Sequence, residues 1–308
     1  MDGLISNVAA LVGVSSASCR RIANGAHRRY KVFTIAKRGG GRRVVAQPAR
    51  EVKAVQRAVC QLLSENLPVH DSATAYKAGT SIAANAAAHA GAQFLTKLDF
   101  SDFFPSISGD LISDLLRRRC EHLTEAEIEF VVDVCTWRPD GRKVLCIGAP
   151  SSPLLANAVM FEFDCEAFEA ASEMCVSYTR YSDDIALSSM VPDTLRQAET
   201  AVRRIIASRP ALRVNERKRV AVGRGTSMVI TGLTLTNQGG VSVGRSRKRG
   251  VRAGVNRYLL GELDEADTLK LKGEVAFVLS IEPEFRGVLV RTYGLRVWTL
   301  LPRMVAGG

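Results

Sequence analysis

The sequence predicts an α+β protein in which helices interrupt a set of antiparallel strands, with further helices at both ends of the chain. Three observations carry this prediction. Apolar residues recur at helical spacing near both termini, two segments alternate like β-hairpins, and an apolar strand ends in the carboxylate of Asp99. The 308 residues, 46% of them hydrophobic, suffice for one large core or for two to three coupled subdomains.

The N-terminal third predicts helices on either side of a basic hairpin. Residues 1–26 place apolar side chains at helical spacing. Tyr30–Ala46 alternates around three glycines at 39–41, which indicates a β-hairpin. Residues 51–66 and about 81–91 return to helical patterns.

The rest of the chain predicts strands that alternate with helices. Ser152 followed by Pro153 has N-cap and N1 character and predicts a helix that runs through Phe163. The other expected elements are a buried strand at Phe94–Asp99, helices near 109–120 and 124–136, a hairpin at 175–189, a helix at 193–207, strands near 211–222, 227–235 and 241–243, and helices from about 245.

The charge balance favours a polyanionic partner. Lys and Arg number 42 against 31 Asp and Glu, which gives a net charge of +11 and a pI of about 9.6. A basic surface gains free energy by releasing counterions from a phosphate backbone. The charge alone does not separate RNA from DNA, or either of them from an acidic membrane.

Cysteine usage and hydropathy predict a soluble, cytoplasmic protein without membrane association. The seven cysteines are scattered, and no two stand at C-x-x-C spacing, so neither a zinc site nor a disulfide framework is indicated. The N-terminus lacks a basic segment followed by a long apolar run, and charges interrupt every apolar stretch.

Three aspartates are the candidate catalytic residues. Asp99 ends an apolar strand, while Asp183 and Asp184 form a pair in an expected turn between apolar strands. Two or three carboxylates can hold a pair of Mg²⁺ ions for phosphoryl transfer. An adjacent Asp pair also has a simpler explanation, because aspartate favours turns.

Several segments resemble the conserved motifs of reverse transcriptases, in the family's order and spacing. They are FLTKLDFSDFFPSI at Phe94–Ile107 (motif A), CIGAPSSP at Cys146–Pro153 (motif B), YTRYSDDIALSS at Tyr178–Ser189 (motif C), VNERKRV at Val214–Val220 (motif D) and VITGL at Val229–Leu233. The similarity runs from about Tyr30 to Tyr258. It implies a right-hand polymerase architecture with fingers, a palm of antiparallel sheet plus helices, and a helical thumb.

The subgroup that the sequence most resembles is the bacterial retron reverse transcriptases. Asn85-Ala86-Ala87-Ala88-His89 matches their NAxxH element, and Ile230-Thr231-Gly232 resembles their VTG triplet. The length also fits that subgroup, with no appended maturase, RNase H or endonuclease domain expected. The resemblance implies an N-terminal helical extension at 1–29, fingers at 30–93, a palm at 94–240 with part of the fingers at about 109–145, and a thumb at 241–308.

The resemblance also implies roles for residues around the active site. Asp99, Asp183 and Asp184 are the expected catalytic residues, and together with Phe100 they are the expected ligands of two Mg²⁺ ions per active site. Asp102 is expected to be an exposed or structural acid, and one of Phe103 and Phe104 to lie in the core. The expected nucleotide-binding residues are Lys37, Arg43, Phe104 as a steric gate against a ribose 2′-OH, Gly148 and Lys218.

Two of these assignments leave an alternative open. Lys218 is a candidate general acid for pyrophosphate, but its basic neighbours allow a solvated strand edge instead. In the hairpin, Arg38 and Arg42 stand close enough to Lys37 and Arg43 to change the register. The sequence also departs from the family at Cys146-Ile147, where Pro-Gln is usual. That departure leaves substrate positioning or fidelity in doubt.

The resemblance further implies two groups of residues that contact nucleic acid. Asn85 and His89 lie four apart and share a helical face, and without the resemblance His89 is interpreted as a hydrogen-bonded structural histidine. The second group is a basic run expected to face the template–primer duplex from a thumb helix, unless it is only a solvated face: Arg245, Arg247, Lys248, Arg249 and Arg252.

The leading hypothesis is an RNA-directed DNA polymerase that copies a structured noncoding RNA into msDNA, a branched RNA–DNA hybrid. Its expected partners are that RNA as template and primer, its msDNA product, dNTPs and a separate effector protein in antiphage defence. Two rivals remain: a group II intron-like, diversity-generating or untemplated reverse transcriptase, and a non-enzymatic RNA or msDNA scaffold.

Overall fold

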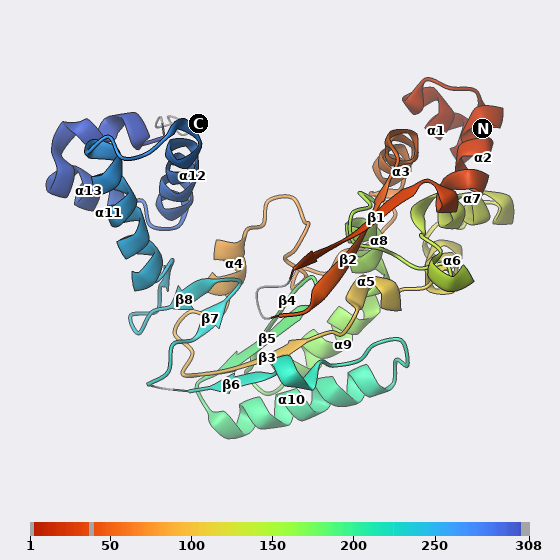
Figure 1. Ribbon diagram of the computed structural model, residues 1–308. Coiled ribbons are helices and arrows are strands. Elements are labelled where there is room, and N and C mark those ends of the chain that lie inside the picture. Colours follow the sequence, from red (N-terminus) through yellow and green to blue (C-terminus); the bar gives the residue numbers. More distant parts are fainter. Residues whose placement is uncertain (1–2, 37–39, 224, 303–308) are drawn as a thin grey trace.

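The computed structural model describes residues 3–36, 40–223 and 225–302. Within these ranges the strands form three antiparallel sheets with the orders β1–β2, β4–β5–β3–β6 and β7–β8–β9. The four-stranded sheet lies in the middle, with the N-terminal helices and the β1–β2 hairpin toward one end and the C-terminal helices at the other (Figure 1). The expected α+β class is confirmed.

The N-terminal part forms a group of helices from which a two-stranded hairpin extends. The single helical stretch expected over residues 1–26 is divided, because Gly13 adopts a φ of 76° and ends α1. Ser15 then caps the next helix by accepting a hydrogen bond from the Ser18 N–H. The bounds are α1 Leu4–Val12, α2 Ser16–Gly25, the 3-10 helix η1 Ala26–Arg28, β1 Tyr30–Ala36, β2 Arg42–Pro48 and α3 Arg50–Leu63.

The middle of the chain contains the central strands and the helices that cover them. The expected helix through Phe163 is wrong, because the first helix ends at Val159 with Met160 as its C-cap, and a second one begins at Phe161. Its N-cap is Ser151, not Ser152. The bounds are α4 Ile82–Ala87, β3 Phe94–Asp99, α5 Phe103–Ser106, α6 Gly109–Arg119, α7 Glu125–Cys135, η2 Pro139–Gly141, α8 Ser152–Val159, α9 Phe161–Ser172, β4 Ser177–Tyr181, β5 Asp184–Ser189 and α10 Pro192–Ala207.

The C-terminal part is a small sheet followed by helices. The strand expected from residue 211 begins only at Val220, because residues 216–218 form a 3-10 turn. The bounds are η3 Glu216–Lys218, β6 Val220–Val222, β7 Val229–Ile230, β8 Leu233–Leu235, β9 Val241–Ser242, α11 Arg245–Leu259, α12 Glu265–Ile281, α13 Phe285–Tyr293 and η4 Gly294–Leu300.

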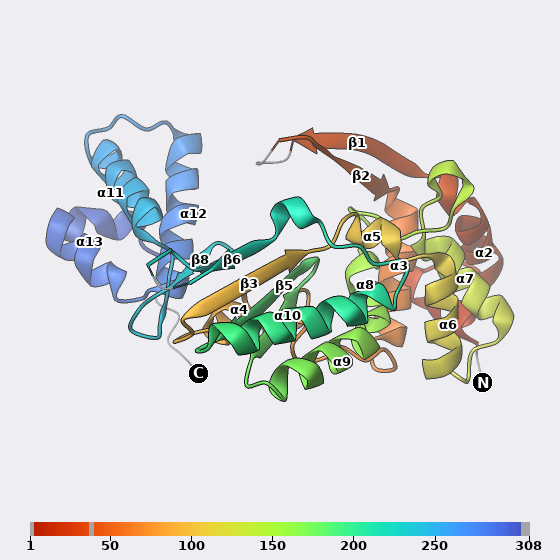
Figure 2. The ribbon, with the colours of Figure 1, turned by 90° about the horizontal axis from the view of Figure 1, so that it is seen from below.

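The two faces of the central sheet differ in what covers them. Leu98 pairs with Ile185, and both belong to the apolar core that also contains residues of α9 and α10. These two helices run along one face of the sheet (Figure 2). Successive side chains of a strand point to opposite faces, so Asp99 and its partner Asp184 point away from α9 and α10.

Among the described residues there are two large apolar cores and a small third cluster of Ala46, Cys146 and Ala149 at the base of the β1–β2 hairpin. The larger one joins the N-terminal helices, the palm helices and one face of the central sheet. The second gathers β7, β8 and the C-terminal helices, and it reaches the sheet at Leu95 and Ala186. No helix among the described residues is both long and apolar enough to cross a bilayer. The domain boundaries at 30, 94 and 241 stay predictions.

Candidate active site

The three predicted aspartates meet where β3 ends beside the β4–β5 turn. Asp99 and Asp184 are partners in the β3–β5 ladder. The backbone N–H of Phe100 donates to the carbonyl of Asp183 at 2.9 Å, which joins the end of β3 to the turn. The structure therefore gathers side chains that are more than 80 positions apart in the sequence onto one open face of the sheet.

The β4–β5 turn has a strained backbone. Tyr181 pairs with Asp184, so only Ser182 and Asp183 form the loop. Ser182 adopts a φ of 60°. This conformation costs a non-glycine residue about 1–3 kcal/mol, and it persists only where the surrounding structure holds it. What holds this turn therefore bears directly on where Asp183 and Asp184 point.

A fully buried ion pair holds the turn from behind. The Arg180 guanidinium donates from Nε and Nη2 to the Asp164 carboxylate on α9, at 2.8 and 2.6 Å. Its third nitrogen, Nη1, donates to the carbonyl of Ser182 at 2.9 Å. Both charged side chains are completely shielded from solvent. Because two hydrogen bonds to α9 fix the guanidinium, its Nη1 in turn fixes Ser182, the residue that precedes Asp183.

Other polar groups complete this network. The Tyr178 hydroxyl donates to Asp164 at 2.7 Å, and the Asn157 Oδ1 accepts from Arg180 at 3.2 Å. Burial by itself lowers the pKa of Arg180, but the Asp164 carboxylate outweighs it and raises that pKa. The sequence reasoning missed Arg180 and Asp164. The available signal was an arginine inside a buried strand, which requires an anionic partner.

The three neighbouring carboxylates would be stabilised by a bound cation. Burial, with a contribution from the Asp99 carboxylate, raises the pKa of Asp183 despite Lys218 and Arg43 nearby. Asp184 is solvent-accessible on one side, yet the protein around it and the carboxylates of Asp183 and Asp99 raise its pKa to about 7. Carboxylates packed this closely repel one another.

Lys218 lies inside the site. Its Nζ donates to both carboxylate oxygens of Asp99, at 2.8 and 2.7 Å. The alternative of a solvated strand edge is therefore wrong for Lys218. The neighbouring Arg219 instead donates two hydrogen bonds to the Glu199 carboxylate on α10, at 2.6 and 2.7 Å. Lys218 is thus a cation in direct contact with one of the three predicted aspartates.

The donor set fits a divalent cation of the Mg²⁺ type. Carboxylate oxygens are the hard ligands that Mg²⁺ prefers, and three of them lie together here. The side chain of Phe100 is buried and apolar, so only its backbone oxygen could contribute. Among the described residues, no three Asp, Glu, His or Cys side chains already surround one point as a finished metal site. Lys218 engages Asp99 instead.

A cavity opens in front of the aspartates, between the palm and the β1–β2 hairpin. Arg42, Arg43 and Val44 line it from β2, and Ile147 lines it from the motif B loop. Its remaining lining residues are Tyr76, Asp99, Phe100, Ser101, Asp102, Phe103, Phe104, Pro105, Trp137, Ser182, Asp183, Asn215 and Lys218. Lys37, the other fingers residue expected to bind nucleotide, lies outside the described residues.

The two phenylalanines of motif A separate as expected. Phe103 is buried and stacks on Phe100, with ring centres 5.8 Å apart. Phe104 is only partly buried and lines the cavity, and its ring centre lies 6.5 Å from that of the exposed Tyr76 ring. Tyr76, which sequence reasoning missed, has a φ of 61°, and its neighbour Ala75 is held by a hydrogen bond from Asn157 at 2.8 Å.

The structure explains why a glycine is required at position 148. Its φ is 113°, and an added Cβ would lie 2.9 Å from the carbonyl oxygen of Ala46. The close approach that a glycine permits is therefore toward the hairpin strand β2. In the same loop the Ile147 carbonyl accepts from the Ala46 N–H at 2.9 Å, and the Cys146 thiol contacts the Ala46 carbonyl at 3.4 Å. Motif B thus anchors the hairpin.

Asn85 and His89 are buried, which contradicts the expectation that they contact nucleic acid. Asn85 accepts a hydrogen bond from Thr74 at 2.8 Å. The two ring nitrogens of His89 contact Ser188 on β5 and Thr179 on β4, both at 2.8 Å. Burial lowers the pKa of His89 to about 4. It is the structural histidine of the alternative interpretation, because both of its nitrogens are used inside the protein.

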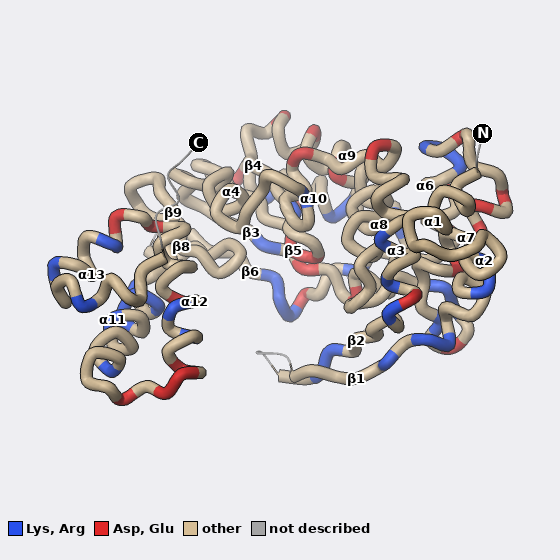
Figure 3. Tube along the Cα trace, turned by 90° about the horizontal axis from the view of Figure 1, so that it is seen from above, with Lys and Arg blue, Asp and Glu red and all other residues tan. Residues whose placement is uncertain are grey.

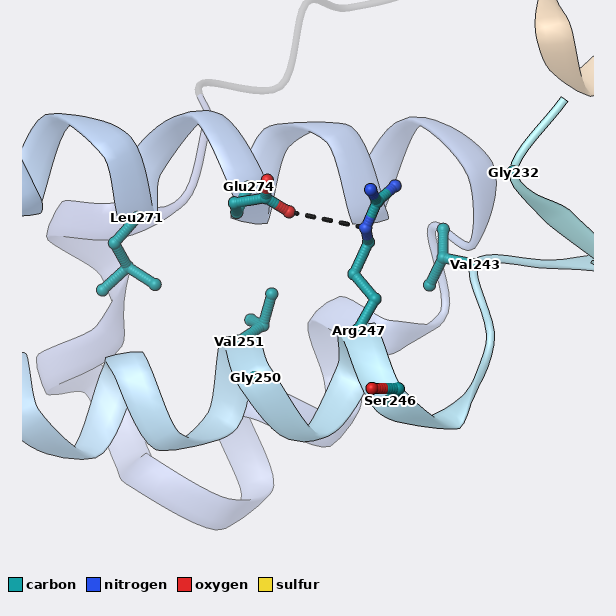
Figure 4. A pocket seen from close by; sticks show the side chains of 8 residues that line it. All are labelled: Gly232, Val243, Ser246, Arg247, Gly250, Val251, Leu271 and Glu274. Carbon is teal, nitrogen blue, oxygen red and sulfur yellow. Dashed lines mark ion pairs between the residues drawn. The ribbon is translucent and has the colours of Figure 1, made fainter. Parts of the chain in front are cut away.

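The basic run of α11 divides into two faces. Arg245, Arg249 and Arg252 are exposed. Arg247 turns toward Glu274 across a pocket between α11 and α12 (Figure 4), at 3.6 Å, and its guanidinium lies over Phe277. Lys248 pairs with Glu282 at 2.5 Å. Acidic side chains of α12 and its end therefore engage Arg247 and Lys248, and the expected contact of these two residues with the duplex stays a prediction.

Known proteins resemble this chain over most of its length. The sequence profile described as reverse transcriptase (RNA-dependent DNA polymerase) matches residues 35–235. The Retron Ec83 reverse transcriptase of Escherichia coli is 35% identical over 287 residues, 91% of each chain. The Retron Ec73 reverse transcriptase of Escherichia coli is 31% identical over 273 residues, 85% of this chain and 86% of that one.

Solved structures share the fold at low sequence identity. Telomerase from Candida tropicalis superimposes with a TM-score of 0.54 at 12% identity, over 86% of this chain and 59% of that one. Telomerase from Candida albicans, in complex with a fragment of telomeric RNA, gives 0.53 at 13% identity, over 91% and 56%. This chain spans a little more than half of either telomerase. These likenesses support the expected right-hand architecture.

Proposed function

This chain belongs to the retron reverse transcriptases and is an RNA-directed DNA polymerase, and from that premise we propose that it copies a structured noncoding RNA into msDNA. The observation that carries the proposal is the cavity between the β1–β2 hairpin and the palm, into which Asp99 and Asp183 open. Template, primer end and dNTP must meet at such carboxylates for the 3′ end to grow.

Asp99, Asp183 and Asp184, with the backbone oxygen of Phe100, are proposed to hold two Mg²⁺ ions. When bound, such ions lower the charge on the triphosphate and help to ionise the attacking hydroxyl. The protein's own groups supply the rest. Arg43 contacts the triphosphate, Phe104 crowds a ribose 2′-OH, and Lys218 donates a proton to pyrophosphate.

The partners follow from the same family membership. We propose that the cognate RNA serves as both template and primer, and that a separate effector protein acts with the RNA–msDNA complex in antiphage defence in the cytoplasm. The exposed arginines Arg245, Arg249 and Arg252 of α11 are proposed to contact the template–primer duplex, since they share one helical face and have no acidic partner among the described residues.

Primer extension on an RNA template with Mg²⁺ and dNTPs tests the catalytic proposal. We expect wild type to extend the primer and Asp183→Ala to abolish extension while RNA binding stays intact, because only metal coordination is lost. Glu129→Ala, which removes one exposed carboxylate from α7, is the matched control and should extend normally. Extension by Asp183→Ala would show that the site is assigned wrongly.

A non-enzymatic scaffold for RNA or msDNA is the competing function. No incorporation of dNTPs by wild type in the same assay would favour it. The template class is settled by purifying the protein from its native host and sequencing the nucleic acid that copurifies. A branched RNA–DNA species supports the retron reaction, whereas unbranched or untemplated DNA would point to one of the other bacterial reverse transcriptases.

A further inference from the structure

The excess positive charge of the chain is concentrated at its N-terminal end. The first 64 residues carry 12 Lys and Arg against 2 Asp and Glu, whereas the remaining 244 carry 30 against 29. One fifth of the chain therefore supplies +10 of the net +11. Such a segment attracts polyanions whatever the rest of the molecule does.

Part of this charge forms one surface at the root of the β1–β2 hairpin. Arg50, Lys53 and Arg57 lie on α3 within about 60° of one another at 3.6 residues per turn, opposite the buried face of that helix. The Ala49 N–H donates to the Arg29 carbonyl at 2.7 Å, which places Arg28 and Lys31 beside the start of α3. We call Arg28, Lys31, Arg50, Lys53 and Arg57 the fingers-base surface. Figure 3 shows Lys and Arg positions along β1, β2 and α3 at this end of the molecule.

These side chains lack the acidic partners that basic residues have elsewhere. In the palm, Arg203 pairs with Glu216 at 2.6 Å and Arg219 pairs with Glu199 at 2.6 Å. Glu51, the acidic side chain of α3, pairs with Arg29 at 3.1 Å. Among the described residues, none of the five members of the fingers-base surface forms an ion pair.

Stability of the fold does not explain this charge. Arg50 is the first residue of α3, where the helix dipole disfavours a cation. Arg50 and Arg57 are both exposed and contribute no packing to the core. Charges that the fold neither pairs nor needs are available to an external ligand.

The composition of the surface selects the kind of ligand. Four of the five members lie in residues 1–29 and 49–64, which contain no Phe, Tyr or Trp and so offer no platform on which unpaired bases could stack. Lys31 lies on β1, where Tyr30 is half-buried and Phe33 is exposed. A surface made mostly of arginine and lysine suits the phosphates of a double helix, which is contacted by its backbone and shape. The base of the fingers therefore fits a duplex better than a single strand.

The position of the surface separates it from the cavity. Arg42 lines the cavity at one end of the hairpin, where it pairs with Ala36, and Tyr30 pairs with Pro48 at the other end. The six steps between these pairs place Arg42 roughly 20 Å from the root of the hairpin at 3.3 Å per residue, and none of the five members lines the cavity. We propose that the fingers-base surface binds a duplex stem of the partner RNA outside the catalytic cavity. This proposal rests on the proposed function, which supplies RNA as the partner.

The test measures RNA binding while the cavity is already filled. The protein is first held with a chain-terminated primer on a short template plus the next dNTP. A fluorescently labelled RNA hairpin with a 20-base-pair stem is then titrated and followed by anisotropy. The test variant is Arg50→Gln/Arg57→Gln. The matched control is Arg196→Gln/Arg204→Gln, which removes two exposed arginines from α10.

We expect the hairpin to bind the filled wild-type protein and the control alike. The test variant should bind roughly tenfold more weakly at 0.1 M salt, and its plot of log affinity against log salt should be shallower by about 1.8, since each lost phosphate contact removes about 0.9. Extension of the short primer should be unchanged in both variants, because neither pair of arginines lines the cavity.

Several results would overturn the proposal. These are displacement of the hairpin from wild type by the filled cavity, equal affinity of the test and control variants, or tighter binding of a DNA hairpin of the same sequence. Failure of the proposed function is seen separately, as absence of primer extension by wild type. In that case the hairpin titration is run without filling the cavity, and dependence on Arg50 and Arg57 still supports the RNA surface.

Discussion

Two hairpins face the cavity, β4–β5 in the palm and β1–β2 in the fingers, and they are held in different ways. The palm hairpin is buried in a four-stranded sheet and fixed at its turn by Arg180 and Asp164. The fingers hairpin has two strands, and apolar side chains point to solvent from both of its faces: Val32, Phe33, Ile35 and Val44 are 49, 38, 45 and 48% exposed.

The difference between the two hairpins indicates that the palm side of the site is the more preorganised part. The palm carries the three aspartates proposed to bind metal, and a buried ion pair and its hydrogen bonds fix the turn that carries two of them. In the described part of the chain no second layer covers the exposed side chains of the fingers hairpin, and its strand β2 is hydrogen-bonded to the motif B loop.

The largest expected effect comes from breaking the buried ion pair. Asp164→Leu leaves the Arg180 charge uncompensated in the protein interior, which should lower the free energy of unfolding by about 3–5 kcal/mol. Urea denaturation measures this change. The double variant Arg180→Met/Asp164→Leu should recover much of the stability but not the rate of synthesis, because the Ser182 carbonyl loses its donor. Equal rates for the double variant and wild type would contradict a positioning role.

A second effect in the palm depends on pH and on His89. The pKa of His89 is lowered to about 4 by burial, against about 6.5 in an unfolded chain. The unfolded state therefore binds the proton first, so stability should be lost as the pH falls from about 6.5 to 4, by roughly 3 kcal/mol. Unfolding followed at a series of pH values measures it. His89→Gln should flatten this dependence, whereas His122→Gln, an exposed histidine, should not.

A smaller effect is expected where the palm meets the bound sugar. Phe104→Ala removes the ring that crowds a 2′-OH, so discrimination of dNTPs against NTPs should fall by roughly 10- to 100-fold. Single-nucleotide extension with each substrate measures the ratio. Phe168→Ala, at an exposed site on α9, is the control. Unchanged rejection of NTPs would assign the gate elsewhere, with Tyr76 as the next residue to test.

The smallest effect is expected in the fingers hairpin. Arg43→Gln should raise the KM for dNTP several-fold without changing stability, because Arg43 is exposed and lines the cavity from a hairpin whose side chains are mostly exposed. Arg42→Gln serves as the comparison, since Arg42 already donates to Thr34 at 2.6 Å. A larger effect at Arg42 would move the triphosphate contact by one residue. A loss of stability in Arg43→Gln would contradict the contrast between the two hairpins.

Local patterns were sufficient for most elements and for the catalytic residues. Alternation located the hairpins, and the Asp99 and Asp183-Asp184 motifs located the ends of the strands that the structure brings together. The points where a helix or strand is interrupted were harder to predict from the sequence. The helix boundary at Met160 and the 3-10 turn at Glu216–Lys218 interrupt patterns that looked continuous, because no proline or glycine marks either point.

By itself the sequence determined the α+β class, the reverse transcriptase motifs and the three aspartates, since strand alternation, turn chemistry and motif order are carried by neighbouring residues. The tertiary structure decided which charged and polar side chains are free to act. Arg180 finds Asp164 on α9, Arg247 and Lys248 find Glu274 and Glu282, and His89 fills its hydrogen bonds from β4 and β5. The partner of a charge comes from another element, and packing of the whole chain chooses it.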